Sequence, residues 1–245
     1  MSVAIIGGTG LTSLKHLEIT RREVVHTPYG EPSGIITHGR FHGRDIMFLP
    51  RHGYSHTIPP HRVNYRANLW ALRHLGVDRL IAVAAVGGIS SAMMPGRIAV
   101  PDQIIDYTWG RAHTFFENDL THVTHVDFTH PYDRDLRNLM IAAARAAKVD
   151  AVEQGTYGAT QGPRLETAAE IARLQRDGCD LVGMTGMPEA SLAREVDIAY
   201  ASCAVVANWA AGLQTDVITM EDIELNLKGG MDRVRLLLGE LIPSL

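Results

Sequence analysis

Apolar residues follow two spacings along this chain, and together they predict an α/β protein. Short apolar runs predict strands at residues 3–6, 79–86, 98–107, 155–159, 181–183 and 197–207, and a β-hairpin at residues 35–49. Several of these runs end at Gly or at a polar residue. Strands that alternate with helical segments favour a central mixed β-sheet flanked by helices, in one domain that spans residues 1–245.

Helices are predicted where apolar residues recur every three or four positions. One helix is expected from Val63, and a second carries Pro131 in its first turn. Thr167 and Glu170 fit a capping box, so a third helix begins just after Thr167. A last helix, with Thr219 as its expected N-cap, presents a long apolar stripe to the core.

Composition and charge limit the kinds of molecule that the chain is expected to bind. The chain has 245 residues, 46% of them hydrophobic, with 23 basic and 27 acidic side chains and a net charge of −4. Without a basic tail or patch, nucleic acid and membrane are not expected as partners, and a small-molecule substrate is favoured. The two cysteines, Cys179 and Cys203, and a first strand without a signal-peptide pattern favour a reducing, cytoplasmic location.

Two segments carry groups that suit an anion. Residues 51–61 combine Arg51 and His52 with hydroxyls, Gly and a Pro-Pro pair in a loop that a helix follows. The Gly-rich turn at residues 7–10 offers backbone N–H groups and the Thr9 hydroxyl. Each segment can also be a plain surface turn. The turn at residues 7–10 lacks the third Gly of a dinucleotide fingerprint and the Gly-Lys ending of a P-loop.

A polar stretch at residues 110–130 lacks helical or strand periodicity and predicts a long loop. It contains four histidines, but without any spacing typical of a metal site, so no metal is expected. A loop of this length in a compact domain is usually functional or docks on a neighbouring molecule.

The order of residues 51–72, RHGxxHTIPPHxVNYxANLWAL, resembles the signature of the methylthioadenosine phosphorylase branch of the purine nucleoside phosphorylase family. The similarity runs through most of the chain. It implies an α/β fold and an enzyme that uses inorganic phosphate as co-substrate, without a cofactor, to cleave a purine nucleoside.

The resemblance implies a phosphate site at Thr9, Arg51, His52 and Thr185, together with the backbone at Ala84. The methylthioadenosine branch usually has Thr at position 84, so one hydroxyl contact is absent here. The tetrapeptide at residues 39–42, Gly-Arg-Phe-His, is similar to the phosphate loop of the other branch, but it lies one strand too early and is interpreted as a decoy.

The base site implied by the resemblance lies beneath the purine at Ala85, Val86 and Gly87, with Leu165 in place of a stacking Phe. Glu166, Asn208 and His52 are the expected catalytic residues. Glu166 and Asn208 match the pattern of enzymes for 6-oxopurines, whereas the 6-aminopurine branch has Ser and Asp at these places. That branch also has an Asp where this chain has Ala210.

The sugar site implied by the resemblance contains Met184 at the ribose, with Met220 and Ile223 as an apolar wall for the 5′ group. The long loop would bring His125 to the site of an adjacent subunit, which implies a homotrimer. Glu189 is assigned to the helix dipole or to a network near the ribose.

Combined, these residues favour phosphorolysis of methylthioinosine to hypoxanthine and 5-methylthioribose 1-phosphate. The alternatives are methylthioadenosine phosphorylase, a general inosine and guanosine phosphorylase, a hydrolytic nucleosidase, and a non-catalytic nucleoside-binding protein.

Overall fold

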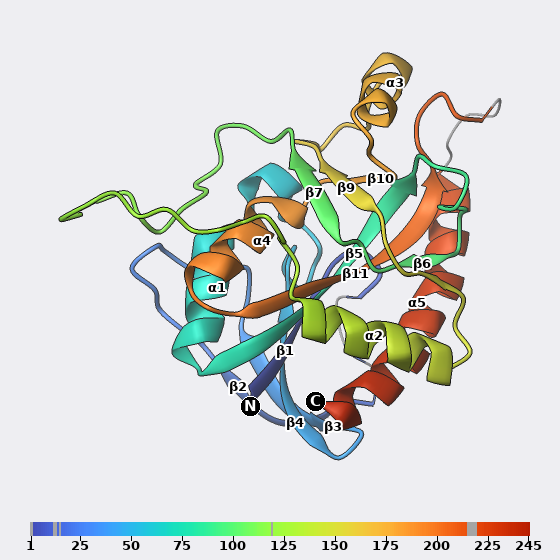
Figure 1. Ribbon diagram of the computed structural model, residues 1–245. Helices are drawn as coiled ribbons and strands as arrows, with labels where there is room; N and C mark the ends of the chain where they lie inside the picture. The colour runs from blue at the N-terminus through green and yellow to red at the C-terminus, as the bar shows by residue number, and fades with distance from the viewer. Residues whose placement is uncertain (1, 12–13, 15, 119, 215–219) are drawn as a thin grey trace.

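A mixed β-sheet runs through the molecule, and helices cover both of its faces (Figure 1). The computed structural model describes residues 2–11, 14, 16–118, 120–214 and 220–245. The strands are β1 (Ser2–Gly7), β2 (Glu18–Glu23), β3 (Ile36–Phe41), β4 (Arg44–Pro50), β5 (Val77–Gly88), β6 (Ile98–Ala99), β7 (Gln103–Asp106), β8 (Ala151–Val152), β9 (Thr156–Ala159), β10 (Leu181–Gly183) and β11 (Ala199–Trp209). The helices are η1 (Pro60–Arg62), α1 (Tyr65–His74), α2 (Arg134–Ala146), α3 (Ala168–Arg176), α4 (Gly186–Glu195) and α5 (Met220–Ser244).

The sheet branches at β5. Its path runs β2-β3-β4-β1-β5-β10-β9-β7, while β11 pairs with β5 and leads to β6 and β8. Strand β5 is parallel to β1 and β11, but its last residues pair antiparallel with β10. The carboxyl end of β5 therefore lies where the strand order divides, which is the usual place for a ligand in an open α/β sheet.

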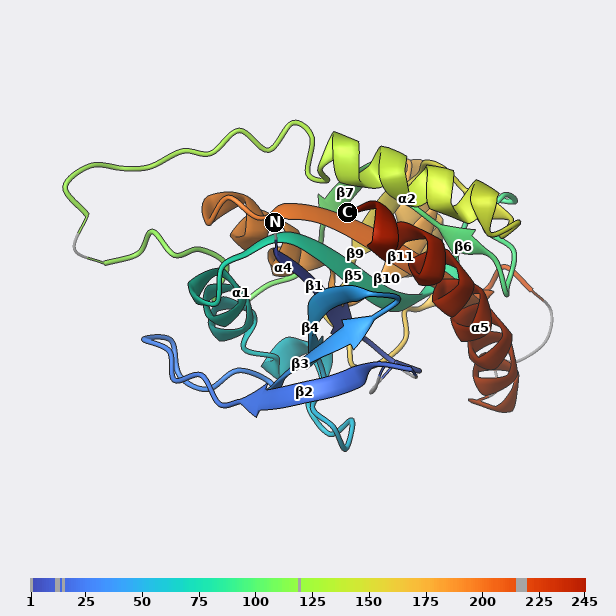
Figure 2. The same ribbon diagram turned by 90° about the horizontal axis from the view of Figure 1, so that it is seen from below.

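Two apolar cores lie on the two faces of the sheet. Side chains of a buried strand point alternately to opposite faces, so Ile5 of β1 packs with α2 and α5, whereas Ile6 packs with α1 and α4. Figure 2 shows the same division, with α1 and α4 on one side of the strands and α2 and α5 on the other. Both cores are continuous apolar clusters, which makes the sheet a rigid base for the loops at its end.

The observed helix starts follow capping chemistry. Helix α1 begins two residues later than predicted, because Asn64 accepts a hydrogen bond from the N–H of Ala67 as its N-cap. The prediction that Pro131 lies in the first turn of its helix is wrong, because Asp133 caps α2. The capping box of Thr167 and Glu170 is confirmed at the start of α3. Thr219 lies outside the described residues.

The predicted hairpin is confirmed as β3 and β4, joined at His42 and Gly43. Both residues have positive φ, 47° and 82°, as the tight turns that connect twisted strands require. No described helix of the chain is both long and apolar enough to cross a membrane.

The predicted long loop is also present. Residues 110–118 and 120–130 contain neither helix nor strand, and they extend away from the sheet as an arm (Figures 1 and 2). The apolar side chains of Trp109 and Val123 on and beside this arm are 72% and 73% exposed.

Candidate active site

A cavity of about 370 Å³ opens at the carboxyl end of β5. Its walls come from the loop after β4, the junction of β10 and α4, the end of β11 and the first turns of α5. The sequence-predicted residues that line it are Thr9, Arg51, His52, Ala84, Ala85, Val86, Gly87, Leu165, Glu166, Met184, Thr185, Asn208 and Ile223. His125 is exposed on the arm and does not line the cavity. The side chain of Met220 lies outside the described part of the chain.

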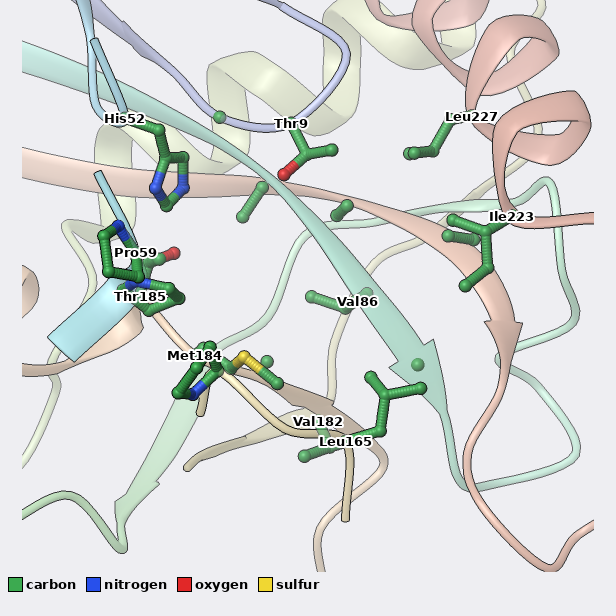
Figure 3. A pocket seen from close by; sticks show the side chains of 18 of the residues that line it. Thr9, His52, Pro59, Val86, Leu165, Val182, Met184, Thr185, Ile223 and Leu227 are labelled. Carbon is green, nitrogen blue, oxygen red and sulfur yellow. The ribbon is translucent and has the colours of Figure 1, made fainter. Parts of the chain in front are cut away.

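The cavity has chemically different ends (Figure 3). His52, Pro59 and Thr185 lie together on one side, and the Thr9 hydroxyl points into the space beside them. Ile223, Leu227 and Leu165 lie on the opposite side, and the Met184 thioether lies between the two groups. Residues 39–42, interpreted as a decoy, are in β3 and its turn and are absent from the described lining.

Arg51 is a buried cation at the polar end. Its Nε and Nη2 each donate to a carboxylate oxygen of Glu189 at 2.7 Å, and its Nη1 donates to the carbonyl of Val83 at 2.8 Å. The hydroxyl of Tyr200 donates to the same carboxylate at 2.9 Å. A guanidinium has five N–H donors, and two of those of Arg51 have no partner among the described residues and can serve a ligand. The groups that hold Arg51 fix the direction of those two donors.

Glu189 is therefore the buried counter-ion of Arg51. It is 0% exposed and lies in the first turn of α4, where the helix dipole also favours a carboxylate, and both of its oxygens accept hydrogen bonds from Arg51. Burial opposes the charge of Arg51, but the Glu189 carboxylate outweighs burial and raises the pKa of the guanidinium above its ordinary value. Arg51 stays charged at every ordinary pH.

The Gly-rich turn closes tightly over Arg51. A Cβ atom on Gly8 would lie 2.6 Å from the Val83 carbonyl oxygen and 2.8 Å from Arg51 Nη1. Both contacts are too short for any side chain, so only glycine lets the turn bring Thr9 to the cavity.

His52 is a neutral imidazole with a defined tautomer. Its Nδ1 lies 2.8 Å from the carbonyl oxygen of Ile58, which can only accept, so Nδ1 carries the proton and Nε2 has a lone pair. Burial, and then the charge of Arg51, lowers the pKa of His52 from 6.5 to about 4. At neutral pH, Nε2 can accept a hydrogen bond from a hydroxyl of a phosphate.

His56 is a site residue that the sequence reasoning did not select. It lines the cavity, its Nε2 lies 3.3 Å from Thr9 Oγ1, and its ring centre is 4.8 Å from that of His52. Burial lowers its pKa. The available signal was the second His of the RHGxxH pattern, which returns to the same pocket because Gly53 and His56 both have positive φ.

Thr185 completes the polar end. It occupies the N-cap position of α4, yet in the described chain its hydroxyl makes no capping hydrogen bond. The side chain is buried and lines the cavity. Its hydroxyl can thus donate to an anion in the cavity.

Asn208 enters the cavity through a β-bulge. In the pairing of β11 with β5, Val206 lies opposite Val86 and Asn208 lies opposite Gly87, so Ala207 is an extra residue. Asn208 Nδ2 donates to the carbonyl of Trp209 at 2.7 Å. Within the described residues, the second N–H and the amide oxygen have no partner and can bind a ligand.

Glu166 is held by a neighbouring hydroxyl. Thr160 Oγ1 donates to Glu166 Oε1 at 2.5 Å, and both residues lie in the loop between β9 and α3. One oxygen of the carboxylate is thereby occupied, and the other is available to accept from a donor on a base.

Arg111 joins the loops around the cavity, and the sequence reasoning did not select it. Its Nε donates to the Gln161 side chain at 3.1 Å, its Nη1 to the carbonyls of Met184 and Met187 at 2.9 and 2.6 Å, and its Nη2 to the Gln161 carbonyl at 2.9 Å. The guanidinium also lies over the ring of Tyr65. It links the loop that carries Glu166 to the loop that carries Thr185.

Among the residues that the structure describes, no three His, Cys, Asp or Glu side chains gather where they could share a metal ion. The expectation that the site takes no metal stays a prediction.

The chain is similar to known proteins over almost its full length. The model of the phosphorylase superfamily matches residues 2–243. A probable S-methyl-5′-thioinosine phosphorylase of Pseudomonas syringae pv. tomato is 55% identical over 241 residues, which cover 98% of both chains. A 6-oxopurine nucleoside phosphorylase of Pyrococcus furiosus is 46% identical over 250 residues, with 99% of this chain and 93% of the relative covered.

The fold is also that of a solved structure, methylthioadenosine phosphorylase from Schistosoma mansoni in complex with adenine. The two chains superpose with a TM-score of 0.95 at 32% identity, over 99% of this chain and 91% of the other. The predicted fold class, a mixed sheet flanked by helices, is confirmed.

Proposed function

This chain belongs to the phosphorylase superfamily, and we propose that it converts S-methyl-5′-thioinosine and phosphate to hypoxanthine and 5-methylthioribose 1-phosphate. The observation that carries the proposal is that one cavity is lined by the phosphate donors, by Asn208 and Glu166, and by the apolar side chain of Ile223. Relatives that are named for this activity are 52–55% identical to the chain.

The reaction breaks the bond between C1′ and N9 as a phosphate oxygen bonds to C1′. Positive charge develops on the ribosyl group in the transition state, and the purine leaves with the electron pair of the broken bond. Catalysis therefore needs a positioned anion on one side of the sugar and a stabilised leaving group on the other. Arg51, His52, Thr9 and Thr185, with the backbone at Ala84, hold the phosphate.

The leaving purine is stabilised by Asn208 and Glu166. As the bond to C1′ breaks, N7 of the leaving purine takes up a proton from solvent. The amide oxygen of Asn208 accepts from the resulting N7–H, and its remaining N–H donates to O6. The Glu166 carboxylate accepts from N1–H. Adenine lacks N1–H and carries a donor at C6, so each mismatched buried group costs about 1–3 kcal/mol.

The methylthio group is placed against the apolar end of the cavity. Ile223 and Leu227 both line this end, and Leu227 is buried. A 5′-hydroxyl group would meet no polar partner from these two side chains, whereas a methylthio group buries apolar surface there. Met220, predicted for the same wall, is part of the proposal only by its place in the sequence.

A second candidate is phosphorolysis of ordinary 6-oxopurine nucleosides. It is favoured by the 46% identity to the Pyrococcus furiosus enzyme. Asn208 and Glu166 would form the same hydrogen bonds with the base in this reaction. The two candidates differ only at the 5′ group, where the apolar pair Ile223 and Leu227 supports the methylthio substrate.

A product assay with and without phosphate tests the proposal. Methylthioinosine with phosphate should give equal amounts of hypoxanthine and 5-methylthioribose 1-phosphate. Hypoxanthine released without phosphate would indicate a hydrolase, and binding without any base release would indicate a nucleoside-binding protein.

The homotrimer, the role of His125 and the cytoplasmic location are part of the same proposal. The exposed Trp109 and Val123 support burial of the arm against another copy of the chain. Two unpaired, buried cysteines, Cys179 and Cys203, suit a reducing compartment. Light scattering gives the subunit number, and a monomer with full activity would contradict a site shared through His125.

The coverage of the family model supports the prediction that residues 1–245 form one phosphorylase domain.

A further inference from the structure

The bulge in β11 determines where the side-chain amide of Asn208 lies. Successive side chains of a regular strand face opposite sides of the sheet, yet Ala207 and Asn208 both line the cavity. The extra residue, Ala207, produces this change of direction because it has no partner across the pairing with β5. Asn208 reaches the cavity only while this bulge keeps its shape.

The carbonyl group of the extra residue is held from another element. Asn226 of α5 donates from Nδ2 to the Ala207 carbonyl oxygen at 2.9 Å. A bulged residue loses its place in the ladder of backbone hydrogen bonds, and a buried carbonyl without a donor is costly. The side chain of Asn226 supplies that donor, 19 residues further along the chain.

The neighbours of the bulge are fixed by backbone hydrogen bonds. The N–H of Gly96 donates to the Val206 carbonyl at 2.6 Å, and the N–H of Ala210 donates to the Gly88 carbonyl at 2.8 Å. The strand is thus anchored before and after Ala207 and Asn208. Asn226 provides the side-chain contact that holds the Ala207 carbonyl between these two anchors.

Asn226 lies on the same turn of α5 as the apolar end of the cavity. Ile223 precedes it by three residues and Leu227 follows it directly, and both line the cavity. Positions three and four apart lie on one side of a helix. One helical turn therefore forms the wall for the 5′ group and also holds β11, the strand that carries Asn208.

From these contacts we infer that Asn226 is a positioning residue for base selection: its amide fixes the bulge at Ala207, which sets the direction of Asn208 into the cavity. The inference rests on the proposed function, because it assigns Asn226 a part in the preference for 6-oxopurines. Asn226 itself is not among the described residues that line the cavity. It acts through the Ala207 carbonyl.

Two variants of similar size test the role. Asn226→Leu removes the donor, and Asn226→Asp replaces it with a carboxylate that repels the Ala207 carbonyl. We expect kcat/KM for methylthioinosine to fall about tenfold in both. We expect a smaller change in kcat/KM for methylthioadenosine, since Asn208 does not match adenine. The ratio of kcat/KM for methylthioinosine to that for methylthioadenosine should therefore fall. The KM for phosphate should stay unchanged.

The controls separate positioning from general damage. Asn226→Gln keeps an amide donor and should retain most of the substrate ratio, and Leu225→Ala, at an exposed position of the same helix, should match the wild type. An equal loss for both nucleosides, or an unchanged ratio in Asn226→Asp and Asn226→Leu, would overturn the inference.

Binding of the free bases, measured by calorimetry, tests the role of Asn226 independently of the proposed function. If the wild-type protein cleaves none of the nucleosides, the proposed function fails, but the affinities for hypoxanthine and adenine still report on Asn208. Asn226→Asp should then lower the affinity for hypoxanthine about tenfold and leave that for adenine nearly unchanged. Equal changes for the two bases would reject a positioning role. Thermal unfolding identifies any variant that does not fold, and if Asn226→Leu is one, the isosteric Asn226→Asp compared with Asn226→Gln still tests the role.

Discussion

Replacing Glu189 by Gln is the most direct way to disturb the buried cation of the phosphate site. The substitution keeps the size of the side chain but removes its charge, and it places an amide N–H group where Arg51 now donates. Glu189 accepts two hydrogen bonds from Arg51 and one from Tyr200, and both charged side chains are at most 1% exposed. The change therefore leaves a buried guanidinium without its counter-ion.

The expected loss of stability is large. Breaking a buried ion pair by removing one partner costs about 3–5 kcal/mol. For a protein of this size, about 1 kcal/mol shifts Tm by roughly 2–4 °C, so Glu189→Gln should lower Tm by about 6–20 °C. Phosphate should raise the Tm of the variant more than that of the wild type, because the bound anion compensates the unpaired charge of Arg51.

Thermal unfolding followed by circular dichroism, with and without phosphate, measures both effects. Glu195→Gln is the matched control, since Glu195 lies on the same helix but binds Thr114 and the N–H of Phe115 outside the cavity. If Glu189→Gln unfolds within about 1 kcal/mol of the wild type, or responds to phosphate no more than Glu195→Gln, Glu189 does not hold Arg51 for the anion.

Four other substitutions each disturb one part of the site. Asn208→Asp should lower the kcat/KM ratio of methylthioinosine to methylthioadenosine about tenfold, and a raised ratio in a two-substrate competition assay would contradict the base assignment. Burial and Arg51 lower the pKa of His52 from 6.5 to about 4, so the unfolded chain takes up a proton first and the free energy of unfolding falls as pH drops through this range. Urea unfolding at stepped pH should show a shallower fall for His52→Gln. Ile223→Ser should lower the preference for methylthioinosine over inosine about tenfold in steady-state assays, whereas an unchanged preference would place the 5′ group elsewhere. Arg111→Lys should raise KM for nucleoside and phosphate together, because one ammonium group cannot hold the carbonyls of both loops; an increase confined to one substrate would argue against this link.

Much of the site could be predicted because its residues follow recognisable patterns. Arg51 and His52 come directly after a strand, and Thr185 lies at the start of a helix, so chain order alone places them at one edge of the sheet. Asn208 comes directly after the predicted strand at residues 197–207, although the structure includes it in β11, and Glu166 lies in the loop after β9. The strands themselves could be predicted from apolar runs that are long enough to be buried.

Other features depend on contacts between distant segments. Glu189 meets Arg51 across 138 positions, and a Glu in the first turn of a helix has an adequate local explanation in the helix dipole. Arg111 lies in a loop without periodicity, so its carbonyl partners become visible only in the fold. The bulge at Ala207 lies within a run of small apolar residues, and such a run predicts a regular strand. Pro131 was misplaced because Asp133, two residues later, is the better N-cap.

The proposed substrate preference depends on an amide at Asn208 that hydrogen-bonds a 6-oxopurine and on an apolar wall at Ile223 that receives a methylthio group. Steady-state kcat/KM values for methylthioinosine, methylthioadenosine and inosine, each with saturating phosphate, test it most directly. Methylthioinosine should be the best substrate by about tenfold or more over each of the others. Methylthioadenosine as the best substrate would contradict the role of Asn208, and inosine as the best substrate would contradict the role of the apolar wall.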